Sequence, residues 1–386
     1  MRFTKEAAFA CILCISIVAG VSIFLCYKNY FAAVHTAIQG DAATAALNQS
    51  QSDTQSDDVL SITAVGDISL GRGVGSRIVS LHGSDFTYCF GKVREYLNKA
   101  DLTFGNLESP ISDRGTPSTY KPINLRNSTK SFEAIKFAGF DILNLATNHM
   151  MDYGAQALFD TLDILKANGI AFAGAGENIE QARRPAIIEI KGRKIGMLAY
   201  TDMAYIRFSN SEDFPAARSD KPGVAPREEK IIKEDVEKLR DNVDILIVSF
   251  HWGIEESFAI ANEQRQLAHE LLDLGADMII GHHPHQFQGI EIYKGKPIMY
   301  SLGNFLFDQN DPENQETFIV NMEYEGTTLK RLYAIPMRTI DKTQVVPQYG
   351  EAALPMLERQ AYLSSELDTE CEIVGDVLYY KKAHIN

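Results

Sequence analysis

The fold is decided by the stretch from Val59 to Ser69, VLSITAVGDIS. Apolar and polar side chains alternate through its first half, which predicts a β-strand. Asp67 follows at the carboxyl end of that strand, where open α/β sheets bind their ligands. A carboxylate buried at the end of a central strand needs a cation or several hydrogen-bond donors. We therefore expect Asp67 to bind a cation; the alternative is a turn-capping aspartate, which is common in Gly-Asp pairs.

The same arrangement, a predicted strand followed by metal-binding or proton-transferring side chains, recurs four more times. The motifs are Gly105-Asn106-Leu107-Glu108, Thr147-Asn148-His149, Ser249-Phe250-His251-Trp252-Gly253 and Gly281-His282-His283-Pro284-His285. Carboxylate, carboxamide and imidazole groups are ligand types of divalent-metal sites. Because the motifs stand at successive strand ends, we expect them to converge on one divalent cation of the manganese or zinc class. The expected ligands are Asp67, Glu108, Asn148, His251, His283 and His285.

The cluster from His282 to His285 is the sharpest metal signal, with a surface histidine cluster as the alternative. His283 and His285 are two residues apart, so their imidazoles point the same way from extended backbone. Pro284 between them restricts that backbone. His282 points the other way on this reasoning and is the least favoured ligand of the three.

Proton transfer is the function that we expect of His149, because imidazole works as an acid or base near neutral pH. Asp152 follows three residues later and faces the imidazole if this segment forms a helical turn. The carboxylate would then fix the tautomer of His149 and raise its basicity. The alternative is that Asn148 caps a helix beside a partly buried histidine, and both descriptions can hold together.

Composition restricts the partners of the chain. Its 386 residues suit one large α/β domain with appendages, and a formal net charge of −14 excludes general nucleic-acid binding. A polyanionic ligand would need a bound cation or local bases, for which Arg72, Lys121 and Arg126 are candidates. Asn106 and Asn304 are further candidates for substrate binding, although Asn304 fits a turn equally well.

Strands and helices alternate from residue 59 onwards. The periodic patterns predict helices over residues 130–138, 155–167, 227–240 and 263–274 and β-hairpins over 187–200 and 290–300. Together with the strands at the five motifs, the hairpins predict an α/β fold in which two sheets pack face to face with helices outside.

The N-terminus predicts a membrane anchor. Residues 7–27, AAFACILCISIVAGVSIFLCY, are uncharged and long enough to span a bilayer. Arg2 and Lys5 precede this run, which favours a cytoplasmic N-terminus and an extracytoplasmic domain. Cleavage as a signal peptide is the alternative, but the residues after the run make a poor cleavage site. The expected division is 1–6 cytoplasmic, 7–27 anchor, 28–58 flexible stalk, 59–338 folded domain and 339–386 C-terminal extension.

Taken together, these motifs resemble the CapA capsule-synthesis family, whose members are associated with making or exporting poly-γ-glutamate. The resemblance extends over about residues 59–308 and includes Gly174-Ala175-Gly176 and Tyr300-Ser301-Leu302-Gly303-Asn304-Phe305. It implies an acidic polymer, poly-γ-glutamate, as the ligand. It also implies the ligase and export subunits of a capsule machinery as membrane partners.

The CapA family is in turn similar to the calcineurin-like metallophosphoesterases, whose fold is a two-sheet sandwich flanked by helices. The matching residues are Asn148, His149, His251, His283 and His285. Two positions depart from that pattern: Ser69 stands where it has a histidine, and Asn106 stands where it has a bridging aspartate, with Glu108 nearby. The departures imply a single metal or a remodelled site.

The leading functional expectation, which rests on the resemblance, is a membrane-anchored extracellular component of poly-γ-glutamate capsule synthesis or export. The residues alone support only a metallohydrolase-like pocket. Two alternatives follow: an extracytoplasmic metal-dependent phosphoesterase or hydrolase of a cell-surface substrate, or a scaffold that binds the polymer without chemistry.

Overall fold

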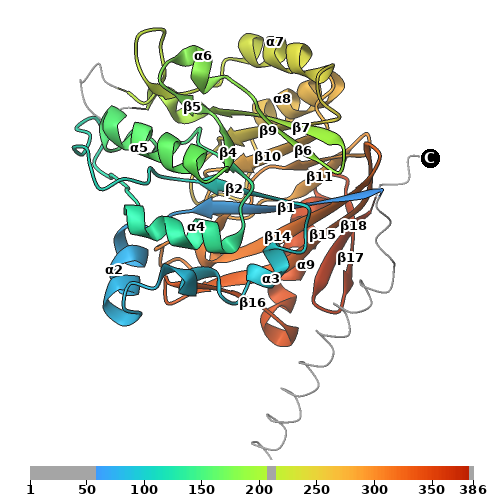
Figure 1. Cartoon of the computed structure of the whole chain (residues 1–386). Helices are drawn as coiled ribbons and strands as arrows, with labels where there is room; N and C mark the ends of the chain where they lie inside the picture. The colour runs from blue at the N-terminus through green and yellow to red at the C-terminus, as the bar shows by residue number, and fades with distance from the viewer. Residues whose placement is uncertain (1–57, 207–213, 382–386) are drawn as a thin grey trace, which may run out of the picture. The chain divides into compact units, whose positions relative to one another are not determined.

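The computed structural model describes residues 58–206 and 214–381, which form an α/β domain (Figure 1). The expected anchor at residues 7–27 and the stalk up to residue 57 lie outside the described residues. Within the two described ranges, no helix is both long enough and apolar enough to cross a membrane.

The larger of two main sheets has ten strands, eight of which follow the order β17-β18-β15-β14-β1-β2-β3-β4, while β13 pairs with β1 and β16 with β15. Strand β1 pairs antiparallel with β14 and parallel with β2, so it lies in the middle of the sheet. The bounds are β1 Val59–Ile68, β2 Leu102–Leu107, β3 Ile142–Asn144, β4 Ala171–Ala173, β13 Asn304–Leu306, β14 Glu316–Glu325, β15 Thr328–Ile340, β16 Gln344–Pro347, β17 Glu370–Val374 and β18 Val377–Lys381.

The smaller main sheet has six strands in the order β11-β12-β10-β9-β7-β6. Its central strands are parallel, and the pairs β6–β7 and β11–β12 are antiparallel, so both predicted hairpins are confirmed. The bounds are β6 Ala186–Ile190, β7 Arg193–Thr201, β9 Ile245–His251, β10 Met278–His282, β11 Ile290–Tyr293 and β12 Lys296–Met299; β5 Ala175–Gly176 and β8 Gly223–Val224 form a separate pair.

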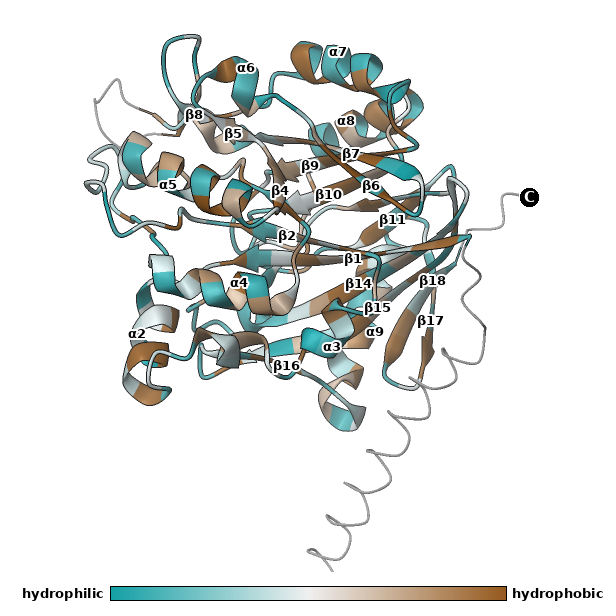
Figure 2. Cartoon of the chain, in the orientation of Figure 1, coloured by the Kyte–Doolittle hydropathy of each residue, from teal (hydrophilic) through white to brown (hydrophobic). Residues whose placement is uncertain are grey.

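Helices flank the sheets, with α4 on the outer face of the larger sheet and α7 and α8 on that of the smaller one, whereas α9 packs against the cluster between the sheets. Their bounds are α2 Arg72–Leu81, α3 Arg94–Leu97, α4 Phe132–Ala138, α5 Gly154–Ala167, α6 Ile179–Ala182, α7 Glu229–Arg240, α8 Asn262–Asp273 and α9 Leu354–Ser365. Short 3-10 helices are η1 Phe86–Phe90, η2 Thr129–Ser131, η3 Asp202–Tyr205, η4 Glu313–Gln315 and η5 Gly350–Ala352. Figure 2 shows hydrophilic and hydrophobic residues mixed along α5 and α7, as expected of helices with one buried side.

The main core lies between the two sheets. In β9, Ile245 and Ile247 belong to the same buried cluster as Leu60 of β1, whereas Leu246 and Val248 face a second cluster with α7 and α8. This alternation is the period of two that a strand buried on both faces requires. The predicted α/β class, with two sheets and flanking helices, is confirmed.

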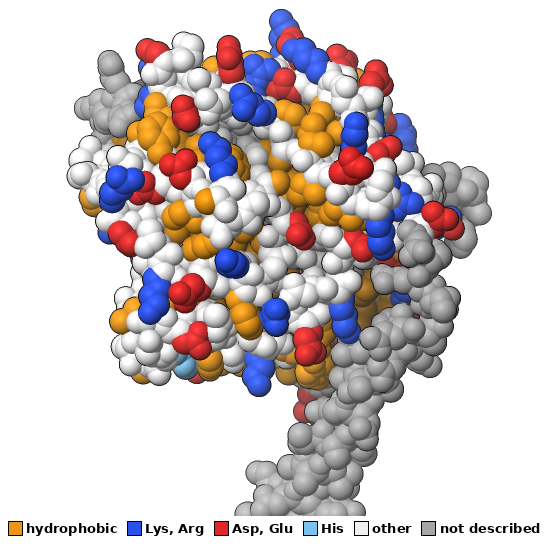
Figure 3. Space-filling view, viewed as in Figure 1, with side chains coloured by type: hydrophobic (Ala, Val, Ile, Leu, Met, Phe, Trp, Pro, Cys, Tyr) orange, Lys and Arg blue, Asp and Glu red, His pale blue; other side chains and the backbone are white. Residues whose placement is uncertain are grey.

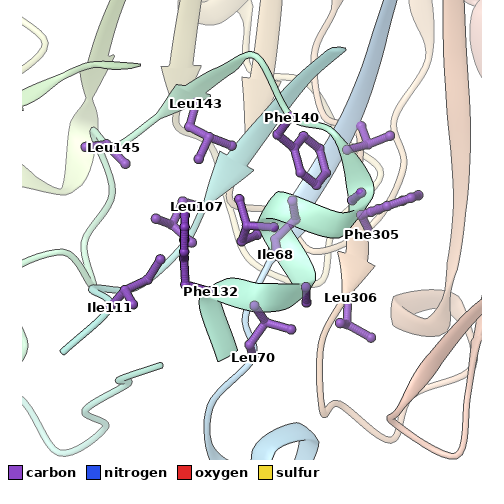
Figure 4. Close-up of a cluster of buried hydrophobic side chains, with 14 of the residues drawn as sticks. Ile68, Leu70, Leu107, Ile111, Phe132, Phe140, Leu143, Leu145, Phe305 and Leu306 are labelled. Atoms are coloured by element: carbon purple, nitrogen blue, oxygen red, sulfur yellow. The ribbon is translucent and has the colours of Figure 1, made fainter. Parts of the chain in front are cut away.

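A third cluster covers the outer face of the larger sheet, between that sheet and α4 (Figure 4). It includes Ile68 and Leu107, the last residues of β1 and β2, which pack with Phe132 and Phe140. Complete burial of such a side chain contributes about 1.5–3 kcal/mol. The apolar packing therefore fixes the two strand ends from behind, while their polar residues face inward.

Residues 339–381, beyond the expected folded domain, continue the same fold. They include helix α9 and the strands β16, β17 and β18, all three of which belong to the larger sheet. On the face shown in Figure 3, lysine and arginine side chains are interspersed with aspartate and glutamate, and no basic stripe is visible.

Candidate metal centre

The alternation of side chains along the strands brings the expected ligands into one space. In β9, Ile247 faces the core between the sheets, and the period of two carries that direction on to His251. In β2, Phe104 faces the same core, and the same period leads through Asn106 to Glu108. The last residue of each series is fully buried, so the polar groups continue the inner face of the core.

A β-bulge in β1 turns Asp67 toward the same space. Ala64 pairs with Phe104 and Asp67 pairs with Asn106, so three residue steps in β1 match two in β2. The extra residue reverses the alternation, and Asp67 shares the direction of Ala64, which faces the core. Gly66 is required at this bend because a Cβ there would lie 2.0 Å from a backbone carbonyl oxygen.

Asp67, Glu108 and His251 form the centre of the site. One ligand atom from each lies within 4.8 Å of the other two. Asn106 lies between the carboxylates and donates one amide N–H to Asp67 Oδ1 (2.7 Å) and one to Glu108 Oε2 (2.9 Å). Glu108 Oε1 has no hydrogen-bond partner among the described residues, although His251 Nε2 is 3.4 Å away. A buried carboxylate oxygen without a donor is costly unless a cation binds it.

The remaining expected ligands, Asn148, His283 and His285, join this group. Asn148 Oδ1 lies 2.9 Å and His283 Nδ1 lies 3.1 Å from His251 Nε2. His285 Nδ1 is 3.5 Å from Asp67 Oδ2. The structure thus brings all six expected ligands into one connected set of contacts. A single N–H at His251 Nε2 cannot serve every acceptor around it, and such a convergence of lone pairs is typical of cation sites.

The backbone on either side of Pro284 is not extended, so that expectation is wrong. His283 has φ +97° and His285 has φ +61°, both in the left-handed region. The His283 N–H at this turn donates to Asp67 Oδ2 (3.3 Å). The two imidazoles still converge, with ring centroids 6.2 Å apart. Residues other than glycine adopt such angles mainly where function or packing demands it.

His282 lies inside the site, so the expectation that it points away is also wrong. Its Nδ1 is 3.2 Å from Asp67 Oδ1, without the geometry of a hydrogen bond, and its ring stacks on Phe104. The reason is the parity of β10: Met278 and Ile280 face the core between the sheets, so His282 faces it too. The expectation instead derived the direction of His282 from the alternation among the histidines that follow the strand.

The pKa values of the two central acids are shifted in opposite directions. Burial alone would raise the pKa of Asp67, but the adjacent imidazoles of His282 and His285 hold it below its ordinary value. Burial, together with the charge of Asp67, raises the pKa of Glu108 well above its ordinary value. Burial and the neighbouring His283 lower the pKa of His251. A cation between the two carboxylates would relieve their repulsion, so this donor set fits a divalent metal ion.

His149 and Asp152 face one another as expected. His149 Nδ1 lies 2.6 Å from Asp152 Oδ2, and the Asp152 backbone N–H donates to the His149 carbonyl (3.1 Å). Lys121 Nζ is 2.9 Å from the same ring nitrogen and 2.5 Å from Asp152 Oδ1. Burial, together with the charge of Lys121, lowers the pKa of His149 well below its ordinary value. Burial raises the pKa of Asp152 to about 7, although Lys121 acts against this shift.

Two of the expected substrate-binding residues reach the surface. Arg72 is exposed, forms an ion pair with Asp308, and lies over the ring of Phe307 at 5.8 Å. Arg126 is half-buried, and its guanidinium lies 4.1 Å from the ring centroid of Tyr153. Both cations are therefore held by neighbours.

The other three expected substrate-binding residues, Asn106, Lys121 and Asn304, are buried. Asn304 Oδ1 lies 2.8 Å from His285 Nδ1, and its amide N–H groups donate to Gln309 Oε1 and to a backbone carbonyl. Asn304 thus contacts an expected ligand, as Asn106 does.

Asn144, the last residue of β3, belongs to the same polar network and is overlooked by the sequence reasoning. Its Nδ2 donates to Asn106 Oδ1 (2.7 Å), and its Oδ1 accepts from the Ala146 N–H (2.9 Å). These bonds fix which way the Asn106 amide is turned. The sequence signal that would have identified Asn144 is Ile142, two residues earlier in the strand. Ile142 faces the core, so Asn144 must face the same way.

Known proteins resemble this chain in sequence and, weakly, in structure. A putative 5′-nucleotidase from Staphylococcus aureus aligns at a TM-score of 0.45 with 15% identity, over 80% of this chain and 58% of that one. A likeness of this extent says nothing about the activity of this chain.

The sequence matches are stronger. The chain is 34% identical to capsule biosynthesis protein CapA of Bacillus anthracis over 285 residues, which cover 72% of this chain and 67% of that protein. It is also 34% identical to PGA biosynthesis protein CapA of Bacillus subtilis over 286 residues, covering 74% and 73%. Residues 61–309 match the model of the family described as bacterial capsule synthesis protein PGA_cap. The resemblance found in the motifs is thereby confirmed, and the chain belongs to the PGA_cap family of bacterial capsule synthesis proteins.

Proposed function

We propose that this protein is a membrane-anchored, extracytoplasmic component of poly-γ-glutamate capsule synthesis or export, and that its inter-sheet pocket binds a divalent cation of the manganese or zinc class. The printed names of two relatives, a capsule biosynthesis protein and a PGA biosynthesis protein, support the capsule role. The apolar run at residues 7–27 supports the anchor. The expected partners are the ligase and export subunits of that machinery.

One observation carries the proposed cation. Asp67, Glu108 and His251 are fully buried, have ligand atoms within 4.8 Å of one another, and include a carboxylate oxygen without a hydrogen-bond partner in the described chain. Asn148, His283 and His285 would complete the ligand set. When bound, a divalent cation supplies Lewis-acid polarisation at this point of the pocket.

The residues of the chain would divide the remaining work. Asn106 holds both carboxylates in place through its two N–H groups. His149, oriented by Asp152, would accept or donate a proton on a bound molecule. The apolar residues of the core exclude water from the inner side of the site, which strengthens each electrostatic interaction there.

Elemental analysis of the full-length protein tests the cation. We expect manganese or zinc to copurify with the wild type and to be lost from the His283→Ala, His285→Ala double variant. His82→Ala, which changes a histidine stacked on Tyr88 outside the site, is the matched control and should keep the metal. Unchanged metal content in the double variant would contradict the assignment.

Protease treatment of intact cells tests the topology. Protease added from outside should release a fragment that contains the domain from Val59 onwards. Protection of that domain in intact protoplasts would contradict an extracytoplasmic location, without bearing on the cation.

A second candidate function is a metal-dependent hydrolase of a cell-surface substrate. The 2.6 Å contact between His149 and Asp152 beside the expected ligands favours it, because this is the arrangement of an oriented general acid or base. A polymer-binding scaffold would not need this pair. Comparing capsule output with turnover on candidate substrates in a His149→Asn strain separates these possibilities.

A further inference from the structure

Lys121 is a buried cation beside the candidate metal centre. Its side chain is 3% exposed, and its ammonium group has three close partners: Asp152 Oδ1 at 2.5 Å, the Asn148 carbonyl oxygen at 2.6 Å and His149 Nδ1 at 2.9 Å. An ammonium group has three donors and no acceptor, so it bonds the Asn148 carbonyl and pairs with the Asp152 carboxylate, whereas His149 Nδ1 could accept from it only through a lone pair.

Two neighbours compete for the Nδ1 atom of His149. A carboxylate only accepts hydrogen bonds, so the contact with Asp152 Oδ2 requires a proton on Nδ1; an ammonium only donates, so a bond from Lys121 would require a lone pair there. The Asp152 contact is the shorter, at 2.6 Å against 2.9 Å. Lys121 is also closer to its other two partners than to the ring. The geometry therefore favours the proton on Nδ1.

The carboxylate of Asp152 is held from both sides. The backbone N–H of Leu125 donates to Oδ2 at 2.6 Å, and Lys121 binds Oδ1 at 2.5 Å. Rotation of the carboxylate would therefore lose the hydrogen bond at Oδ2 or the ion pair at Oδ1. The orientation that remains aims Oδ2 at the ring of His149.

We propose that Lys121 is a positioning residue, which fixes the Asp152 carboxylate so that His149 keeps its proton on Nδ1 and its lone pair on Nε2. The same ammonium binds the carbonyl of Asn148, so one side chain places an expected ligand and the expected proton-transferring group together. The inference rests on the proposed function only for the importance of His149, because the tautomer can be measured whether or not the protein turns over a substrate.

An internal ion pair also explains why a lysine is tolerated here. Lys121 and Asp152 neutralise one another, whereas either charge alone would be costly in the protein interior. A pair of this kind could serve stability alone. In that case its removal would change the free energy of unfolding but not the tautomer of His149, and this difference is what the experiment must measure.

Solid-state NMR of the full-length protein, with ¹⁵N-labelled histidine rings, tests the proposal at one fixed pH. The His149 signals are identified as those lost in His149→Asn. In the wild type we expect a single neutral tautomer with a protonated Nδ1. In Lys121→Met the Asp152 carboxylate is free to turn away from the ring, and losing the Nδ1–H bond to this charged group should lower the ratio of the two tautomers by about tenfold or more. Lys130→Met, which removes an exposed lysine in η2, should leave the ratio unchanged.

Lys121→Met leaves the buried charge of Asp152 unpaired, so a second variant is needed in case the first does not fold. The double variant Lys121→Met, Asp152→Asn removes both charges together, a change that buried ion pairs commonly tolerate. We expect it to fold and to show both tautomers. A single Nδ1-protonated tautomer in either folded variant, a wild type protonated on Nε2, or an unfolded double variant would overturn the proposal. Absence of turnover or of metal in the wild type, with the tautomer effect intact, would instead count against the proposed function alone.

Discussion

Two buried glutamates, Glu108 and Glu291, differ in the hydrogen-bond donors that surround their carboxylates. The carboxylate of Glu291, in β11, is satisfied by the protein: Oε1 accepts from Arg265 (3.0 Å) and His269 (2.9 Å), and Oε2 accepts from the Tyr300 hydroxyl (2.7 Å). Glu108 has a single amide donor on Oε2, no partner on Oε1 among the described residues, and a second carboxylate nearby.

The difference is between a carboxylate that donors of the protein satisfy and one that they leave partly unsatisfied. The guanidinium of Arg265 carries a full positive charge, which balances the negative charge of the Glu291 carboxylate. Around Glu108 the neighbours are an amide and imidazoles, and the negative charge of Asp67 adds to its own. A buried group of this kind needs a further cation. Burial alone therefore does not identify a site; the balance of donors and charges does.

The largest expected effect contrasts His149 and His269, each of which contacts a buried carboxylate. His149→Asn should lower turnover, or capsule output if the chemistry limits it, by roughly 10²–10⁴-fold, because a general acid or base is lost. Asp152→Asn should have a smaller effect. His269→Asn, which changes the partner of Glu291, should leave activity close to the wild type. Capsule measured per cell at matched protein levels decides the matter, and normal capsule in the His149→Asn strain would end the catalytic interpretation.

The next effect concerns the gain in stability from metal. At a free cation concentration of 100 times Kd, binding raises the free energy of unfolding by about 2.7 kcal/mol. Glu108→Gln should lose most of this gain, whereas Glu291→Gln should keep it, whatever its own stability. Denaturant titrations with and without manganese or zinc measure the difference. Equal gains in both variants would remove the distinction between the two carboxylates.

Without added metal, Glu291→Gln should be the more destabilising of the two substitutions. Glu291→Gln weakens bonds from three donors, and we expect it to lower the free energy of unfolding by about 1–3 kcal/mol. Arg265 is partly exposed, which favours the lower part of that range. Glu108→Gln removes a charge beside Asp67, so it should be neutral or stabilising. Chelator-treated proteins provide the comparison, and a larger loss for Glu108→Gln would show that this carboxylate is already compensated.

The smallest expected effect tests the residues behind the carboxylates. Asn144→Ala removes the donor that turns the Asn106 amide and should lower metal affinity by about tenfold, as expected for residues that orient metal ligands. Asn168→Ala, at the end of α5, is the matched control, because its side-chain amide donates to the Ile164 carbonyl of its own helix. Calorimetric titration measures both, and equal affinities would show that Asn106 holds its orientation without Asn144.

Much of the fold and of the ligand set follows from local patterns. Period-two and helical spacing predict both hairpins, and the polar residue after each strand identifies Asp67, Glu108 and His251. The rest depends on tertiary pairing. The β-bulge at Asp67 exists only in register with β2, and the left-handed backbone at His283 depends on the approach of Asp67. The inward orientation of His282 could have been predicted, because the residues two and four positions earlier in β10 also face inward.

Strand β1 changes partner at the position of Asp67, and this fixes when the site can exist. Up to Ala64 its neighbour is β14, and from Asp67 onwards it is β13, whose residues are made much later than those of β1. Asp67 and His283 are likewise separated by 216 positions in the chain. Contacts at such separation form only once the intervening chain is available. Until His283 has been synthesised and has folded against Asp67, the chain therefore cannot provide this arrangement for the proposed cation.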